Sequence, residues 1–307
     1  MHCKVSRRPT EQRHSRGVTL VELVIVLTLL AIIASVAAIA LRDPVIAYRD
    51  SQKRAELTDV ADAALRRMAR DIRLALPNSV RVNGGNLELL LTRTGGRYRS
   101  DPNNLGQGDV LDFAATGPAD TSFDTIGPMN APQAVAINDI LVIYNLYAAA
   151  GIPTANAYTY LSGNCALPNS ATCNTARVTA VGPGVLPNET KISFTERRFP
   201  TGSPGNRFYI LEAPGPVTYA CVPGAVDANG NGTGTLRRVS GYNIALAQAA
   251  GPFPAAPILA KYVTGCSIDY NNLVLTQSLG LVSMTLTLTR GGESVTLYHE
   301  VHVSNIP

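Results

Sequence analysis

The N-terminal part of the chain contains an almost unbroken run of apolar side chains. Residues 18–41 are apolar except for Thr19, Glu22, Thr28 and Ser35. A helix of this length extends for about 36 Å, and the hydrocarbon core of a bilayer is about 30 Å thick. The run therefore predicts one membrane-spanning helix.

Helical periodicity continues after this run. Pro44 has no backbone N–H, so we expect a kink or local break there, with helix resuming at about residue 45 and ending near residue 76. Apolar residues spaced by three and four form one stripe along this segment. They are Leu57, Ala61, Ala64, Leu65, Met68, Ile72 and Leu76. Charged residues occupy the other faces, and most of them are interpreted as solvated, so the second half of the helix is expected to pack on a head domain.

After residue 79 the apolar period changes to two, which is typical of strands. Gly84 and Gly85 separate two such runs, and Gly291 and Gly292 separate the last two, so both pairs predict hairpins. The predicted strands are residues 79–82, 86–93, 109–113, 139–144, 176–181, 191–195, 207–212, 217–221, 273–276, 281–289 and 294–303. The long stretches between them, 94–108, 114–138 and 145–175, are interpreted as loops. The predicted fold class is α+β, with a long N-terminal helix, kinked at Pro44, packed on a β-rich head.

The charge distribution indicates topology and excludes one class of partner. The chain has 307 residues, and only 16% of them are charged. Of its 26 basic and 22 acidic side chains, five basic and one acidic lie in residues 1–17, so the rest of the chain is balanced. A balanced body has no basic surface for phosphates, and no nucleic-acid partner is expected. The basic leader places the N-terminus in the cytoplasm and the head outside the inner membrane.

A specific signal precedes the apolar run. Residues 16–23 read Arg-Gly-Val-Thr-Leu-Val-Glu-Leu, so Gly17 ends a basic leader and Glu22 is the fifth residue after it. This arrangement resembles the prepilin signal of type IV pilins and type II secretion pseudopilins, although that family usually has Phe or Met where this chain has Val18. The resemblance implies that prepilin peptidase cuts between Gly17 and Val18 and methylates the new amino group. The alternative is an ordinary secretory signal cleaved after Ala40, but the apolar run is longer than the usual 7–15 residues and contains a carboxylate.

Glu22 is the only charged residue in the apolar run. One interpretation is a shallow carboxylate favoured by the helix dipole. The other, which the resemblance favours, is an assembly role in which Glu22 pairs with the Val18 amino group of a neighbouring subunit. Carboxylates within membrane segments are costly and are functional-site hypotheses by default.

The segment after the signal resembles one branch of this superfamily more closely. Residues 43–48 (DPVIAY), 54–57 (RAEL), 63–82 and 236–242 (LRRVSGY) resemble the MshO-type minor pilins of the mannose-sensitive haemagglutinin (MSHA) pilus. The resemblance implies a non-enzymatic minor subunit that assembles into or primes a type IV pilus involved in cell adhesion. Its partners would be the prepilin peptidase/methylase, other pilins and the inner-membrane assembly platform. A minor pseudopilin of a type II secretion system is the alternative.

This interpretation divides the chain into four parts. Residues 1–17 are the cytoplasmic leader, 18–41 the transmembrane half of the helix, 42–76 its periplasmic half, and 77–307 the head. The expected location is the inner membrane, with a single pass and a periplasmic head. In an assembled filament the head would be periplasmic or extracellular.

Cysteine usage agrees with this topology. Cys3 lies in the leader, and four cysteines remain in an oxidising compartment, where disulfides persist. Four cysteines allow three connectivities. We prefer Cys165–Cys173 with Cys221–Cys266, because the first pair closes a short loop at low entropic cost. Zinc binding by the four cysteines is the alternative, but the chain has no CxxC.

Two further motifs are interpreted as structural. Asp227, Asn229 and Asn231 match the first half of a calcium loop, but its twelfth position is Arg238 instead of Glu, so a hairpin loop is favoured. His299 and His302 would face opposite sides of a strand. They are the only histidines after the leader, so no catalytic site and no cofactor are predicted. A membrane-anchored periplasmic binding or enzyme domain remains as a different class of function.

Overall fold

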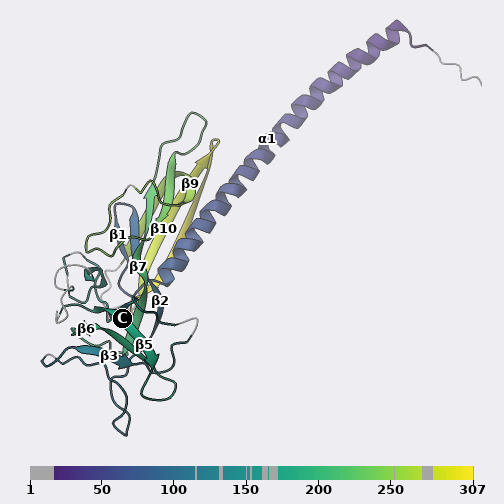
Figure 1. Cartoon of the computed structure of the whole chain (residues 1–307). Helices are drawn as coiled ribbons and strands as arrows, with labels where there is room; N and C mark the ends of the chain where they lie inside the picture. Colours follow the sequence, from purple (N-terminus) through teal and green to yellow (C-terminus); the bar gives the residue numbers. More distant parts are fainter. Residues whose placement is uncertain are drawn as a thin grey trace, which may run out of the picture. The chain divides into compact units, whose positions relative to one another are not determined.

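The computed structural model describes residues 17–114, 116–130, 134–149, 151–152, 154–160, 165, 172–251, 253–271 and 279–306 (Figure 1). The chain forms two compact units, Met1–Gln52 and Lys53–Pro307. Helix α1, Leu20–Arg73, contributes to both. Each unit is described by itself.

The first unit contains the apolar part of α1. The helix is continuous through Pro44, so the local break that the sequence allowed is not present. Because Pro44 has no N–H, the Ala40 carbonyl loses its usual helical donor, and a kink at this point remains a prediction. All side chains of residues 18–41 are exposed in the structure. Within the described residues, α1 is the one helix whose length and composition would allow it to cross a membrane.

In the second unit, the predicted apolar stripe of α1 lies in the core. Leu57, Ala61, Met68 and Ile72 are each at most 3% exposed and pack with side chains of the sheet. Helix-spaced apolar residues therefore supply the inner face of α1, as the periodicity predicted.

The helix ends three residues earlier than expected. The Leu74 N–H is shared between the carbonyls of Arg70 and Asp71, which tightens the last turn. The Leu76 N–H then donates to Leu90 O at 2.7 Å, and the Thr92 N–H donates to Leu74 O at 2.9 Å. Pairing with the neighbouring strand therefore begins at the Leu74 carbonyl and the Leu76 N–H, immediately after the helix.

The rest of the second unit is an antiparallel sheet, which confirms the α+β class. Its elements are β1 (Arg81–Asn83), β2 (Asn86–Arg97), β3 (Asp120–Asp124), β4 (Ile140–Ile143), η1 (Ala157–Thr159), β5 (Thr175–Pro183), β6 (Thr190–Arg197), β7 (Arg207–Val222), β8 (Gly234–Val239), β9 (Ile258–Asn271), β10 (Leu279–Arg290) and β11 (Glu293–Ser304). The strand order is β11-β10-β9-β8-β7-β4-β5-β6-β3, with β2 also paired to β7 and β1 to β2. Both predicted Gly hairpins are present, as β1–β2 and β10–β11.

The long strand β7 joins two parts of the sheet. Its first half pairs with β4 and its second half with β8, while β2 follows it along most of its length. The α1 stripe packs on the part that contains β7 to β11. The other part has a separate core rich in aromatic rings, formed around Tyr98, Phe123, Phe194 and Phe208.

Several strand predictions differ from the structure. Residues 109–113 are not a strand, whereas β3, β8 and β9 were not predicted. The two strands predicted at 207–212 and 217–221 are one strand, β7. The strand predicted at 273–276 lies outside the described residues.

One charged residue of α1, Asp71, is an exception to the interpretation that most of its charges are solvated. Asp71 is 8% exposed, and its Oδ2 accepts hydrogen bonds from Tyr219 Oη at 2.6 Å and Arg238 Nε at 2.9 Å. Tyr219 belongs to β7 and Arg238 to β8, so Asp71 connects α1 to two strands. Burial, helped by this carboxylate, raises the pKa of Tyr219 above its ordinary value.

Candidate functional site at the start of the helix

The predicted processing site lies immediately before the start of α1. Residues 17–19 are not helical, and α1 begins at Leu20. A Cβ built on Gly17 would have no neighbour within 4 Å, and Val18 is 66% exposed. The Gly17–Val18 peptide is therefore accessible and lies outside the helical hydrogen-bond ladder.

Thr19 determines where the helix starts. Its Oγ1 accepts the Glu22 N–H at 3.2 Å, and its carbonyl accepts the Leu23 N–H at 3.1 Å. These two bonds make Thr19 the N-cap residue. Thr19 and Glu22 also have the Thr-x-x-Glu spacing of a capping box, a signal that sequence reasoning could have found.

Glu22 lies in the first turn of α1, where a negative charge is favoured by the helix dipole. Its side chain is exposed on an otherwise apolar surface. The cap uses the Glu22 backbone N–H, so the cap and the carboxylate can be separated by substitution. The structure thus keeps both interpretations of Glu22 open, as a helix-start carboxylate and as a docking group.

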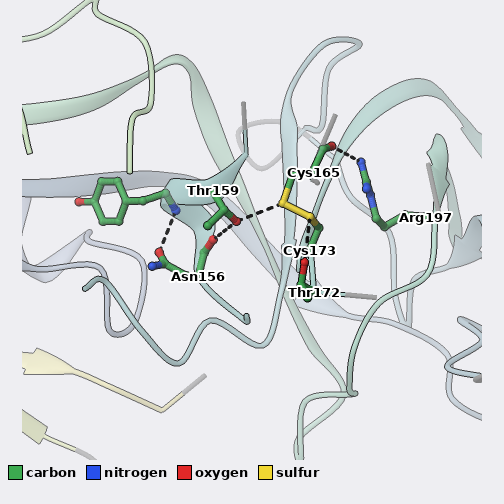
Figure 2. Close-up of a disulfide and its surroundings, with 7 residues drawn as sticks. Asn156, Thr159, Cys165, Thr172, Cys173 and Arg197 are labelled. Carbon is green, nitrogen blue, oxygen red and sulfur yellow. Dashed lines mark hydrogen bonds between the residues drawn. A yellow bond between two sulfur atoms is a disulfide. The ribbon is translucent and has the colours of Figure 1, made fainter. Parts of the chain in front are cut away.

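The structure contains two disulfides, in the connectivity preferred from the sequence. Cys165–Cys173 has a Cα–Cα distance of 5.4 Å. The Cys165 carbonyl accepts a hydrogen bond from Arg197 at 2.9 Å, and Cys165 Sγ lies 3.2 Å from Thr159 Oγ1 (Figure 2). Burial lowers the pKa of the Arg197 guanidinium, which lies on β6. Cys165 therefore contacts both η1 and β6.

The second disulfide, Cys221–Cys266, has a Cα–Cα distance of 6.6 Å and joins β7 to β9. Strand β8 lies between these two strands in the sheet order, so the bridge links strands that are not neighbours. Cys221 belongs to the core that α1 covers, and Cys266 packs against it. The bridge therefore stabilises the part of the sheet on which α1 packs.

We expect non-reducing peptide mapping of the mature protein to recover both cross-linked peptides and no free thiol. The reason is that both bridges are in an oxidising compartment under the proposed topology. Ready labelling of Cys221 and Cys266 by a thiol reagent in the native protein would contradict this pairing.

The calcium-loop motif forms a tight turn in the structure. The N–H groups of Asn229 and Asn231 donate to Asp227 Oδ1 at 2.9 and 2.8 Å, and these bonds lower the Asp227 pKa. Asn231 Oδ1 in turn accepts the Gly291 N–H at 3.0 Å. The loop therefore connects to the tip of the β10–β11 hairpin.

The other candidate ligands are dispersed. His299 and His302 both lie on β11, with His299 partly buried and His302 exposed. In the part of the chain that the structure describes, no three His, Cys, Asp or Glu side chains are grouped so that they could hold a metal ion.

Comparison with known proteins matched the N-terminal segment of the chain to a family. Residues 12–38 match the family described as the prokaryotic N-terminal methylation motif. No curated protein and no solved structure matches the chain. The matched residues contain Gly17, Val18, Thr19 and Glu22, so the motif covers the whole candidate site. The N-terminal segment is therefore a prepilin-type methylation motif, which supports a type IV pilin-like or pseudopilin protein anchored at the inner membrane.

Proposed function

We propose that this chain is a non-enzymatic minor pilin-like subunit that is processed by prepilin peptidase and assembled into, or primes, an MSHA-like type IV pilus. One observation carries the proposal. An accessible Gly17–Val18 peptide stands immediately before a capped apolar helix that has a single carboxylate in its first turn.

In this proposal the peptidase cuts between Gly17 and Val18 and methylates Val18. The helix remains attached after this cut, because the cut precedes the apolar run. Residues 18–41 then anchor the subunit in the inner membrane, and residues 42–307 lie on the periplasmic side. The start of α1 at Leu20 supports the cut, because the scissile peptide can extend into a protease site without unwinding the helix.

Glu22 serves assembly in this proposal. After cleavage the Val18 amino group is positive and lies four residues before Glu22, two residues ahead of the start of α1. In lipid each of these charges is costly when it is unpaired. Pairing between neighbouring subunits removes that cost only in the correct register, so the pair selects one arrangement of helices.

The pilus role is favoured over type II secretion by the resemblance of residues 43–48, 54–57 and 63–82 to MshO-type minor pilins. Residues 63–73 of this segment belong to α1, and residues 81–82 begin β1. The resemblance therefore covers the junction between helix and head.

The location of the subunit tests this choice. We expect an epitope-tagged chain to be recovered with filaments sheared from the cell surface, and its deletion to reduce surface filaments while type II secretion continues. Loss of secretion with normal filaments would instead assign the chain to a secretion pseudopilus.

A further inference from the structure

Strand β11 forms one edge of the sheet, and among the described residues no strand pairs with its outer side. In the strand order β11 is the last strand, next to β10. It pairs with β10 over all 12 residues, Glu293–Ser304, without a register shift. The opposite end of the order is β3, which has 5 residues and a register shift between Asp120 and Ser122. The β11 edge is therefore the longer and more regular of the two.

The turn between β10 and β11 determines which backbone groups of β11 point away from β10. Gly291 and Gly292 form a two-residue loop with φ of 58° and 83°, so Arg290 and Glu293 exchange both hydrogen bonds of their pair. Bonded and non-bonded pairs then alternate along an antiparallel ladder. The outward N–H and C=O groups therefore belong to Ser294, Thr296, Tyr298, Glu300, His302 and Ser304.

This edge lacks the features that usually prevent a sheet edge from pairing with another chain. Such features include lysine, proline and β-bulges in the edge strand. Residues 293–304 contain no lysine and no proline, and their register with β10 is unbroken. Within the described part of the chain, no other backbone group bonds to the six outward positions. The edge is therefore a template for one more strand.

The side chains of β11 indicate what kind of strand fits. Val295 and Leu297 are partly buried and pack against the core that α1 covers, whereas Val301 and Val303 are each 1% exposed. A strand added beside β11 would cover Val295 and Leu297 with its own side chains on that face. The other face of β11 is polar and exposed. The segment that fits is therefore extended, with apolar side chains at every second position.

The direction of α1 decides whether a second copy could supply this strand. Arg54 forms an ion pair with Glu293 at the start of β11, and the Asn78 N–H donates to Asn305 Oδ1 just after its end. Helix and strand therefore run in the same direction within the second unit. Two copies joined through this same edge would form a closed antiparallel pair, with their helices in opposite directions. A second copy is thus excluded, a conclusion that rests on the proposed function, in which every helix enters the same membrane from one side.

We propose that β11 accepts an extended segment of a different protein as a further strand of this sheet. Extended backbone is the partner that matches the edge, because the outward N–H and C=O groups recur at every second residue. Main-chain hydrogen bonds join the segment to residues 294–300, and its apolar side chains lie beside Val295 and Leu297.

A photo-crosslinking residue in place of Tyr298, which is 61% exposed, tests the proposal in the full-length protein in the cells that make it. We expect adducts with a different protein. Thr296→Pro should reduce them about tenfold, because proline removes the outward N–H of residue 296 and its ring fills that position. The matched control Thr296→Val keeps the N–H and should leave the adducts unchanged. Adducts only between copies of this chain, no adducts, or adducts that Thr296→Pro leaves unchanged would overturn the proposal.

Hydrogen exchange provides a second measurement that needs no variant. It compares the unaltered chain alone in detergent with the chain purified together with the crosslinked partner. The N–H groups of Thr296, Tyr298 and Glu300 should exchange at least about tenfold more slowly in the complex, because they gain acceptors there. Those of Val295 and Leu297 already bond to β10 and serve as internal controls. Equal exchange of the outward N–H groups in both samples would overturn strand addition even where a partner is crosslinked.

Two further readouts separate this inference from the proposed function. The mature N-terminus and the recovery of the chain in sheared filaments are measured in the same cells. A removed leader and normal recovery, without adducts from residue 298, mean that strand addition fails and the proposed function stands. A retained leader on the unaltered chain counts against the proposed function itself, whatever β11 binds.

Discussion

Glu22→Ala is expected to reduce recovery of the subunit in filaments by at least about tenfold, with insertion, cleavage at Gly17 and both disulfides unchanged. The alanine leaves the neighbour's amino group without a partner in lipid. An unpaired charge in a membrane costs about 2.5 kcal/mol at mid-depth and less near the interface, and each 1.4 kcal/mol is a factor of about ten. The measurement is the ratio of tagged subunit in sheared filaments to that in the membrane fraction.

Thr19→Ala provides the matched comparison. It removes the hydroxyl that accepts the Glu22 N–H but keeps the carboxylate. Loss of an N-cap costs about 1 kcal/mol, so this variant should enter filaments with a smaller defect. If Thr19→Ala and Glu22→Ala have equal defects, Glu22 acts only at the helix start. Normal incorporation of Glu22→Ala would reject the docking role altogether.

The second large effect is expected in the stability of the head. Asp71→Ala should lower its free energy of unfolding by about 3 kcal/mol. The substitution leaves the partly buried Arg238 guanidinium without its carboxylate and Tyr219 Oη without its acceptor. Removing one partner of a buried ion pair typically costs 3–5 kcal/mol. Urea-dependent proteolysis of the full chain in detergent measures the change.

Asp59→Ala is the control for this prediction. Asp59 lies on the same helix but is exposed, so its removal should change stability by less than about 0.5 kcal/mol. Asp71→Asn keeps an acceptor for Tyr219, so its free energy of unfolding should lie between those of the Asp71→Ala and Asp59→Ala proteins. Equal stability of the Asp71→Ala and Asp59→Ala proteins would show that Asp71 does not hold α1 on the sheet.

The features that follow from local periodicity were predictable from the sequence. The α1 stripe was found because every third or fourth residue from Leu57 to Ile72 is apolar and must be buried together. The β1–β2 and β10–β11 hairpins were found because Gly84, Gly85, Gly291 and Gly292 adopt positive φ, which glycine accommodates at no steric cost.

The features that depend on distant partners were not predictable. The position of the helix end depends on Leu90 and Thr92 of β2. Their backbone groups form hydrogen bonds with Leu76 and Leu74, where the helix would otherwise continue. Asp71 resembles the exposed charges around it, and only the approach of Tyr219 and Arg238 makes it a buried acceptor. Strand β3 lacks a strong alternating pattern and owes its place to pairing with β6.

Most of the candidate site could be predicted from the sequence, because its residues lie close together along the chain. Gly17, Val18 and Glu22 lie within six residues, and their order relative to the apolar run carries the signal. Thr19 was missed as the N-cap because it was treated only as a polar interruption of that run. Its spacing to Glu22 would have identified it.

The mature N-terminus tests the central claim most directly. Mass spectrometry of the chain isolated from membranes should find a protein that begins at Val18 and carries an N-methyl group. A chain that begins at Leu41 would indicate ordinary secretory cleavage after Ala40, and one that retains residues 1–17 would show that prepilin peptidase does not process it. Either result would contradict assignment of this chain as a pilin-like subunit.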